Sequence, residues 1–240
     1  MSDRFDSPDT VIHSELQPTV ERWEDIEARY ADRLVNPCLH PTVVIFVVDE
    51  NAYDLEEKLA TSLYYLEQGR VENCKKGEEG TCKSTIPQGA LEYSDDLYPA
   101  TGIFMETIEG AFFRESAEEM GLAQSDLTID FEMTDRLQKA LWKIDEINMR
   151  PEKKQRKREE TGRAVKRGLY IPIFATTRVV PDLKNAVAAH EDSKTTKKIG
   201  ILDLREDVET TLGKLHHSTT EKKEFIRKAL EILQGIDKVA

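Results

Sequence analysis

The chain has 240 residues and a formal net charge of −12 at pH 7, with 39% hydrophobic and 33% charged residues. Its longest apolar run, at 43–48, is far shorter than the roughly 20 residues of a membrane-spanning helix, and its polar first residues argue against a signal peptide. The three cysteines fit a reducing compartment better than a disulfide framework. We therefore expect no membrane span and a location in the nucleus and cytoplasm.

The first half of the chain predicts an acidic lobe rich in helices. Residues 1–18 are acidic and poor in apolar side chains, which predicts a flexible arm. Apolar residues at three- and four-residue intervals predict a helix at 20–34, and the run at 42–48 predicts a strand buried on both faces. We expect a second helix between Asp49 and Gly69, because Leu55, Leu59, Leu63 and Leu66 form one stripe, and then a long exposed loop at 70–101.

The remaining elements complete a helix-dominated α+β protein. Helices are predicted at 103–120 and from residue 134 to Pro151, where proline interrupts the pattern. Residues 169–180 are rich in β-formers, but Pro172 argues for edge strands or a hairpin. A short helix at 181–190, a strand at 199–202 and a helix at 203–215, with Asp203 and Glu206 as a capping box, follow. A final amphipathic helix at 222–235 presents an apolar stripe for its own chain or for a homodimer.

The charge changes sign in the segment 150–168, which holds nine basic residues. Residues 1–149 carry 32 acidic and 13 basic residues, whereas 150–240 carry 14 acidic and 21 basic residues. We therefore expect a flexible arm (1–18), an acidic lobe (19–149), a basic linker or helix (150–168) and a basic C-terminal lobe (169–240). This asymmetry predicts a polyanionic partner for the basic part, with nucleic acid (RNA) first and an acidic protein or a membrane surface after it. For the acidic lobe it predicts a protein partner.

Twelve residues are candidates for nucleic-acid binding, because cationic side chains neutralise phosphates and aromatic rings stack on bases. They are Arg150, Lys153, Lys154, Arg156, Lys157, Arg158, Arg163, Lys166, Arg167, Tyr170, Phe174 and Arg178. The alternative for the basic residues is a solvated helix face with i,i+4 ion pairs. The alternative for the two rings, which share one face of an extended strand, is a place in the core.

Part of the same segment matches a bipartite nuclear-import signal. The first group comprises Lys153, Lys154, Arg156, Lys157 and Arg158, and the second comprises Arg163, Lys166 and Arg167. This pattern predicts an import receptor as a partner.

Two further motifs are weaker. Residues 77–84, GEEGTCKS, have the spacing of a phosphate-binding P-loop, but Cys82 replaces its second glycine and no strand precedes it. Cys38, His40, Cys74 and Cys82 could ligate zinc, although Cys74 and Cys82 stand too far apart for the usual pairing. No nucleophile with its base can be argued from spacing, so we expect no catalytic residue, metal or cofactor.

The stretch KKQRKREETGRAVKR in a chain of this size resembles accessory proteins of the orthomyxovirus type. The resemblance implies a non-enzymatic viral accessory protein that binds RNA, enters the host nucleus and acts as an interferon antagonist. The alternatives are an adaptor whose acidic lobe binds proteins without nucleic acid, and an NTP-binding enzyme that uses residues 77–84.

Overall fold

The computed structural model describes residues 19–35, 39–69, 83–92, 106–142, 146–148, 167–183, 195–216 and 220–236. Its main sheet has five strands in the order β6-β1-β9-β7, with β8 paired to the same edge of β9 as β7. The bounds are β1 Leu39–Asp49, β6 Gln88–Ala90, β7 Leu127–Ile129, β8 Glu146–Asn148 and β9 Arg167–Thr177. The long strands β1 and β9 are parallel along their full lengths, and the other pairs are antiparallel.

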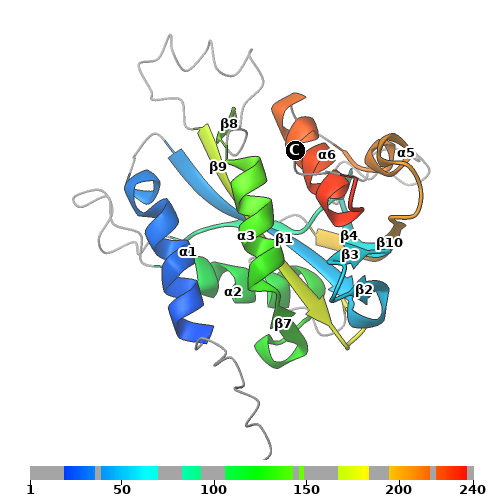
Figure 1. Ribbon diagram of the computed structural model, residues 1–240, viewed down its shortest axis with the longest axis horizontal. Helices are drawn as coiled ribbons and strands as arrows, with labels where there is room; N and C mark the ends of the chain where they lie inside the picture. Colours follow the sequence, from blue (N-terminus) through cyan, green and yellow to red (C-terminus); the bar gives the residue numbers. More distant parts are fainter. Residues whose placement is uncertain are drawn as a thin grey trace, which may run out of the picture.

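The two long strands are buried on both faces because each face packs on a separate hydrophobic core. Successive side chains in a strand point to opposite faces. Val43, Ile45 and Val47 of β1 therefore join the core under α1 (Thr19–Leu34) and α2 (Ile108–Met120). Their neighbours Val44, Phe46 and Val48 join the core under α3 (Phe131–Leu141) and α6 (Thr220–Leu233). Figure 1 shows β1 and β9 side by side, with α1 and α6 on opposite sides of them.

The prediction that Pro172 keeps 169–180 at a sheet edge is wrong, because β9 is a central strand. The amide of Phe174 points away from β1 and donates to Thr134 Oγ1 of α3 over 3.0 Å. Backbone direction repeats every second residue, so the nitrogen of Pro172 also faces away from β1. On that edge of β9, β8 pairs with residues 167–169 and β7 pairs with residues 175–177. Between them the backbone of β9 is bound by α3, because Gln138 donates to the Pro172 carbonyl. The proline therefore costs no ladder hydrogen bond.

The helix predicted between Asp49 and Gly69 is also wrong. A short 3-10 turn (Glu50–Ala52) leads into a hairpin of β2 (Tyr53–Asp54) and β3 (Leu59–Ala60), and then into β4 (Ser62–Gly69). Strand β4 lies between β10 (Thr195–Asp203) and β5 (Lys83–Thr85) in an antiparallel sheet. The leucine stripe is divided accordingly, because Leu63 and Leu66 are fully buried whereas Leu55 is 66% exposed in the hairpin turn.

The helices agree better with their predicted positions. Helices α1, α2, α3 and α6 lie where periodicity places them, although the predicted stripe of the third continues past Leu141 to Ile147, which lies in β8. The box predicted at Asp203 is wrong: α5 (Val208–Gly213) is capped by Asp207, and Asp203 pairs with Arg205. A second 3-10 turn (Gln124–Asp126) precedes β7. The helix predicted at 181–190 lies mostly outside the described residues.

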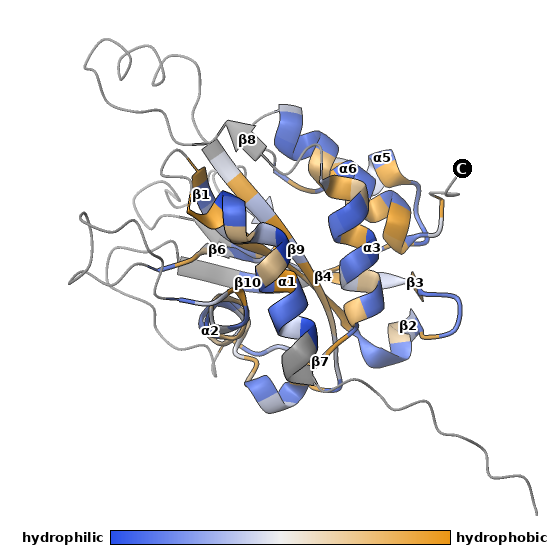
Figure 2. Cartoon of the chain, turned by 60° about the vertical axis from the view of Figure 1, so that its left-hand side comes forward, coloured by the Kyte–Doolittle hydropathy of each residue, from blue (hydrophilic) through white to orange (hydrophobic). Residues whose placement is uncertain are grey.

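The terminal helix α6 buries its apolar stripe within its own chain. Phe225, Ile226, Leu230 and Leu233 are at most 2% exposed and join the same core as Phe174. Figure 2 shows hydrophilic and hydrophobic residues on this helix. The stripe is therefore covered by intrachain packing, and the homodimer remains a prediction.

The expected helix-dominated α+β fold with an acidic and a basic lobe is corrected to an α/β fold with mixed and antiparallel sheets. Strands from both sides of the segment 150–168 interleave, since β1 pairs with β9 and β4 with β10. The charge boundary of the sequence is therefore not a boundary of the sheets. None of the helices in the described ranges is long and apolar enough to cross a membrane.

Candidate active site

The candidate site lies where α2 runs along the free edge of β6. In this edge strand, the amide of Gln88 and the carbonyl of Ala90 point away from β1, because the flanking Pro87 and Leu91 make the bonds to β1. Side chains of α2 satisfy both outward groups: Glu119 accepts from the Gln88 amide over 3.1 Å, and Arg114 donates to the Ala90 carbonyl over 2.9 Å. The helix therefore covers a sheet edge with charged groups instead of another strand.

Caps at both ends fix the position of α2. The side chain of Thr107 accepts a hydrogen bond from the Gly110 amide, which is the usual N-cap arrangement. At the other end Gly121 takes a left-handed conformation with φ 67°, and its amide bonds the Ala117 carbonyl. Trp23 and Phe112 pack α1 against the inner face of α2. The polar face that includes Arg114 is consequently held against β6.

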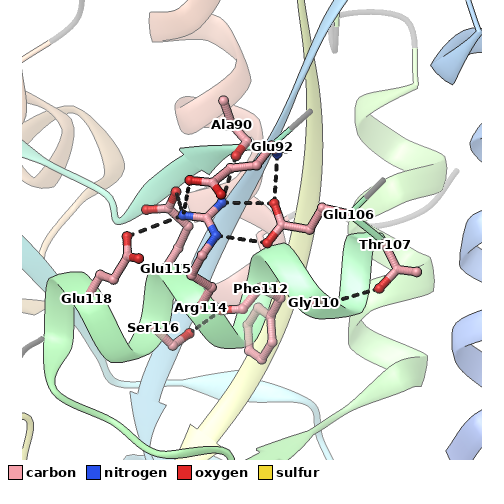
Figure 3. Close-up of polar contacts among 10 residues, drawn as sticks. All are labelled: Ala90, Glu92, Glu106, Thr107, Gly110, Phe112, Arg114, Glu115, Ser116 and Glu118. Atoms are coloured by element: carbon pink, nitrogen blue, oxygen red, sulfur yellow. Dashed lines mark hydrogen bonds and ion pairs between the residues drawn. The ribbon is translucent and has the colours of Figure 1, made fainter. Parts of the chain in front are cut away.

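Arg114 is the centre of the site (Figure 3). Its Nε and Nη2 bind both oxygens of Glu106, at 2.8 and 2.9 Å, in a bidentate pair. Its Nη1 donates to Glu115 at 2.7 Å and to Glu118 at 3.2 Å, and lies 3.8 Å from Glu92. The hydrogen bonds with Glu106, followed by the charge of Glu115, raise the pKa of Arg114 above its usual value. This guanidinium therefore remains charged at any pH at which the protein is folded.

Glu115 occupies space that only a glycine on β6 can leave. A Cβ built on Gly89 would lie 1.6 Å from Cδ of Glu115, which is far inside van der Waals contact. The Glu115 side chain is 12% exposed. Burial raises the pKa of Glu115, although the charge and hydrogen bond of Arg114 act in the opposite direction. A buried carboxylate with a raised pKa, held at one oxygen and next to bare backbone, has the properties of a general base.

Among the described residues, the site carries more negative than positive charge. One guanidinium is surrounded by Glu106, Glu115 and Glu118, with Glu92 and Glu119 beside them. Glu115, Glu118 and Glu119 stand at i, i+3 and i+4 on α2, so they share one helix face. This excess of carboxylate oxygens attracts hard divalent cations such as Mg²⁺.

The carboxylates fit one kind of cation site and not another. Their side chains converge on Arg114, and in the described part of the chain no group of three or more His, Cys, Asp or Glu side chains is arranged to hold a metal. A closed metal site made by protein alone is therefore not present in these ranges. Mg²⁺ in phosphate-processing sites commonly uses only one or two carboxylates together with phosphate oxygens and water. The donor chemistry of α2 fits that second arrangement.

A separate cavity of about 570 Å³ lies at the other end of the main sheet, beside the β2–β3 hairpin. Asp130, the N-cap of α3, accepts hydrogen bonds there from Tyr53 Oη at 2.9 Å and Lys58 Nζ at 2.8 Å. Lys58 has φ 56°, a strained backbone for a side chain, and its ammonium joins the hairpin to α3. Two basic residues that line this cavity are paired with acidic residues that also line it, Lys58 with Asp130 and Arg178 with Glu50. We therefore interpret the cavity as the site of a structural ion-pair network.

We expect the stability contribution of Asp130 to depend on pH. Burial raises its pKa, but hydrogen bonds from Lys58, the Met133 amide and Tyr53 outweigh burial and hold the pKa below its usual value. A lowered pKa stabilises the folded protein above the unfolded-state pKa near 4, and this stabilisation is lost as pH falls through the folded-state pKa. Urea unfolding of wild type and Asp130→Asn should therefore differ most at pH 6 and converge toward pH 3. A difference independent of pH would contradict this account.

Most of the residues predicted to bind nucleic acid lie outside the described residues, so their role remains a prediction. The basic residues 150–166 lie outside the described residues, and Arg167 begins β9. Tyr170 and Phe174 do share one face, as the sequence indicates, but they are only 5% and 0% exposed. They contact Phe225 and Tyr53, respectively, in the core, so neither ring can stack on a base. Arg178 is exposed and paired with Glu50.

The weaker motifs also find no support. Lys83 and Ser84 of the P-loop-like segment lie in strand β5, whereas a P-loop places these residues at a helix N-terminus. Of the four possible zinc ligands, only His40 belongs to the described residues. The import signal, its receptor and the location in nucleus and cytoplasm remain predictions.

Sequence reasoning identified α2 as a helix but missed every residue of its polar face. The available signal was the density of acids around one arginine, with Glu106 before the helix and Glu115, Glu118 and Glu119 on one face of it. The role of Gly89 could not be inferred in this way, because it depends on the approach of α2 to β6 from a distant part of the chain.

No protein-family model matches the sequence, and no curated protein matches it significantly. Similar solved structures include a NUDIX hydrolase from Nitrosomonas europaea, with 12% identity over 82% of this chain and 91% of that chain and a TM-score of 0.42. An Ap4A hydrolase from C. elegans has 13% identity over 82% and 99%, with a TM-score of 0.41. A possible asymmetric diadenosine tetraphosphate hydrolase from Jonesia denitrificans has 9% identity over 83% and 97%, with a TM-score of 0.44.

These observations correct the expected function. All three similar structures are of hydrolases, and none is of an RNA-binding accessory protein. The two rings expected to stack on bases lie in the core. The resemblance to orthomyxovirus-type proteins, with its viral and interferon-antagonist roles, and the expectation of a non-enzymatic protein are therefore wrong.

Proposed function

We propose that this protein is a hydrolase that cleaves phosphoanhydride bonds at the α2–β6 site. The observation that carries the proposal is the buried Glu115 carboxylate, held by Arg114 and packed on the bare backbone of Gly89 within an excess of carboxylates. When bound there, Mg²⁺ would supply Lewis-acid chemistry, which withdraws negative charge from a phosphate group. Glu118 and Glu119 are the residues that would hold it.

The roles of the protein groups follow from their contacts. Glu106 fixes the guanidinium of Arg114 through two hydrogen bonds, and Arg114 in turn orients one oxygen of Glu115. Glu115 accepts a proton from water as the water oxygen attacks a phosphorus atom. The bond from that phosphorus to the bridging oxygen breaks, and the leaving phosphate departs with the electron pair. Burial raises the pKa of Glu115. Activity should therefore fall as the pH is lowered through this raised pKa, because protonated Glu115 cannot accept a proton from water.

The test measures hydrolysis by the purified full-length chain with Mg²⁺. Suitable probes are Ap4A, which the C. elegans neighbour is named for, and ADP-ribose, with p-nitrophenyl phosphate as a monoester without an anhydride. We expect cleavage of at least one anhydride, its loss in EDTA, and a 10²–10⁴-fold lower kcat in Glu115→Gln. The matched control is Glu57→Gln, since Glu57 is exposed in the β2–β3 turn.

Stability separates a catalytic role from a structural one. A raised folded-state pKa means that ionised Glu115 opposes folding, so its contribution is favourable below the unfolded-state pKa and is lost as pH rises. Glu115→Gln should therefore unfold no more easily than wild type at pH 7 while losing activity. Absence of hydrolysis of both anhydrides by wild type, or full activity in Glu115→Gln, would reject the proposed function.

A further inference from the structure

Lys222 is a buried ammonium that the proposed chemistry does not use. It lies in the first turns of α6 and is 9% exposed. Its Nζ donates to Oε1 of Gln88 on β6 over 2.9 Å and lies 5.7 Å from the centre of the Tyr170 ring. Removing an ammonium from water is costly unless it is paired or hydrogen-bonded. The hydrogen bond to Gln88 offsets part of that cost.

Strand β6 is held from two opposite faces. The face of β6 on which a Gly89 side chain would lie is the face that Glu115 of α2 contacts. Because successive side chains of a strand alternate between faces, the side chain of Gln88 lies on the opposite face. That is the face on which α6 packs, and Lys222 binds Gln88 there. The backbone N–H of Gln88 donates a hydrogen bond to Glu119 of α2. One residue of β6 thus connects the buried ammonium to a carboxylate of the candidate site.

The charges make the same connection favourable. Among the described residues, the carboxylates of the site outnumber its one guanidinium. A positive charge on the other face of the edge strand offsets part of that excess across low-dielectric protein. A neutral side chain of the same length would fill the space without this effect and would not fix the amide of Gln88.

We propose that Lys222 is a positioning residue, which holds β6 in place through the side chain of Gln88. With β6 fixed, Gly89 keeps Glu115 in position, and the backbone N–H of Gln88 keeps Glu119 in position. This inference rests on the proposed function for its effect on catalysis, but the clamp itself is a physical contact that can be measured without any substrate. Groups that orient a catalytic site from behind commonly change activity by 10–100-fold when removed.

The first readout is hydrogen exchange of the peptide that covers 83–92 in full-length protein. Lys222→Met removes the ammonium at similar length, and Gln88→Met removes the same bond from the other side. Each should speed exchange in this peptide, the double variant should add little to either single one, and Lys222→Arg should restore protection in part. Exchange in β7, which pairs with β9 at the opposite end of the main sheet from β6, serves as the internal reference.

The second readout is kinetic. We expect kcat to fall about 10–100-fold in Lys222→Met with little change in KM, because substrate contacts remain while the carboxylates lose their position. Unchanged exchange at 83–92 in both single variants overturns the clamp. Faster exchange with unchanged kcat overturns its positioning role. Faster exchange in a protein whose wild type cleaves no anhydride leaves the clamp standing and rejects the hydrolase. If Lys222→Met does not fold, Gln88→Met alone decides the same outcomes.

Discussion

Gly89→Ala should lose at least about a hundredfold in kcat while unfolding at nearly the same urea concentration as wild type. The added Cβ would lie 1.6 Å from Cδ of Glu115, so the carboxylate must leave its position next to β6. The atoms in the way belong to the end of a flexible side chain, which can rotate without moving the backbone. The cost in stability should therefore stay near the lower end of overpacking, about 1 kcal/mol, whereas displacement of a reacting group by about 1 Å can cost 10²-fold in rate.

The control for this substitution is Gly213→Ala, because a Cβ at Gly213 meets no atom within 4 Å. This variant should keep both activity and stability close to wild type. Steady-state hydrolysis and equilibrium unfolding of the two variants give the comparison. Wild-type kcat in Gly89→Ala would mean that the position of Glu115 against β6 does not matter to the reaction.

The strands and helices that periodicity predicted best are those whose pattern reflects one continuous environment. The run at 42–48 is apolar without alternation because both faces of β1 are covered, and α6 shows a clean stripe because one core covers it. A helix was wrongly predicted at 55–66 because its leucines repeat every three or four residues. In the structure these leucines lie in the turn and second strand of the β2–β3 hairpin and in β4. The helical repeat at these positions is coincidental, and only pairing with β10 reveals the strand.

Pro172 illustrates a different limit of sequence reasoning. A proline argues against a central strand because it lacks an amide, and that reasoning is sound when both neighbours are strands. In β9 the affected position faces side chains of α3, which bind the neighbouring backbone groups instead. The partner that makes the proline harmless lies more than thirty residues away in sequence, so no local pattern could have indicated it.

The sequence analysis did not identify the candidate site, because it relied on the local density of basic residues in the segment 150–168. Lysines and arginines at 150–168 are dense in sequence and therefore conspicuous, whereas the acids of α2 matter through their arrangement around Arg114. Charge density along a chain indicates a class of partner, but a site requires groups that converge in space. Here convergence depends on β6, whose three residues have no period of their own to detect.

Leu230→Ala should lower the free energy of unfolding by about 2–5 kcal/mol, the range for a buried leucine that leaves a cavity. Leu230 of α6 is fully buried in the core shared with Phe174 and Phe225, and rigid strands on one side limit how far that core can collapse. Ile236→Ala is the matched control, since Ile236 is 56% exposed just after the same helix and should change stability by less than about 0.5 kcal/mol.

Because the stripe of α6 packs within its own chain, the unfolding midpoint of wild type should be the same at two widely separated protein concentrations. A dimer formed through this helix would instead become more stable as concentration rises, by mass action. Thermal unfolding of wild type and Leu230→Ala at both concentrations therefore tests burial and its intrachain origin together. A loss below about 0.5 kcal/mol would reject the burial, and a midpoint that rises with concentration would place the partner of this helix on a second copy.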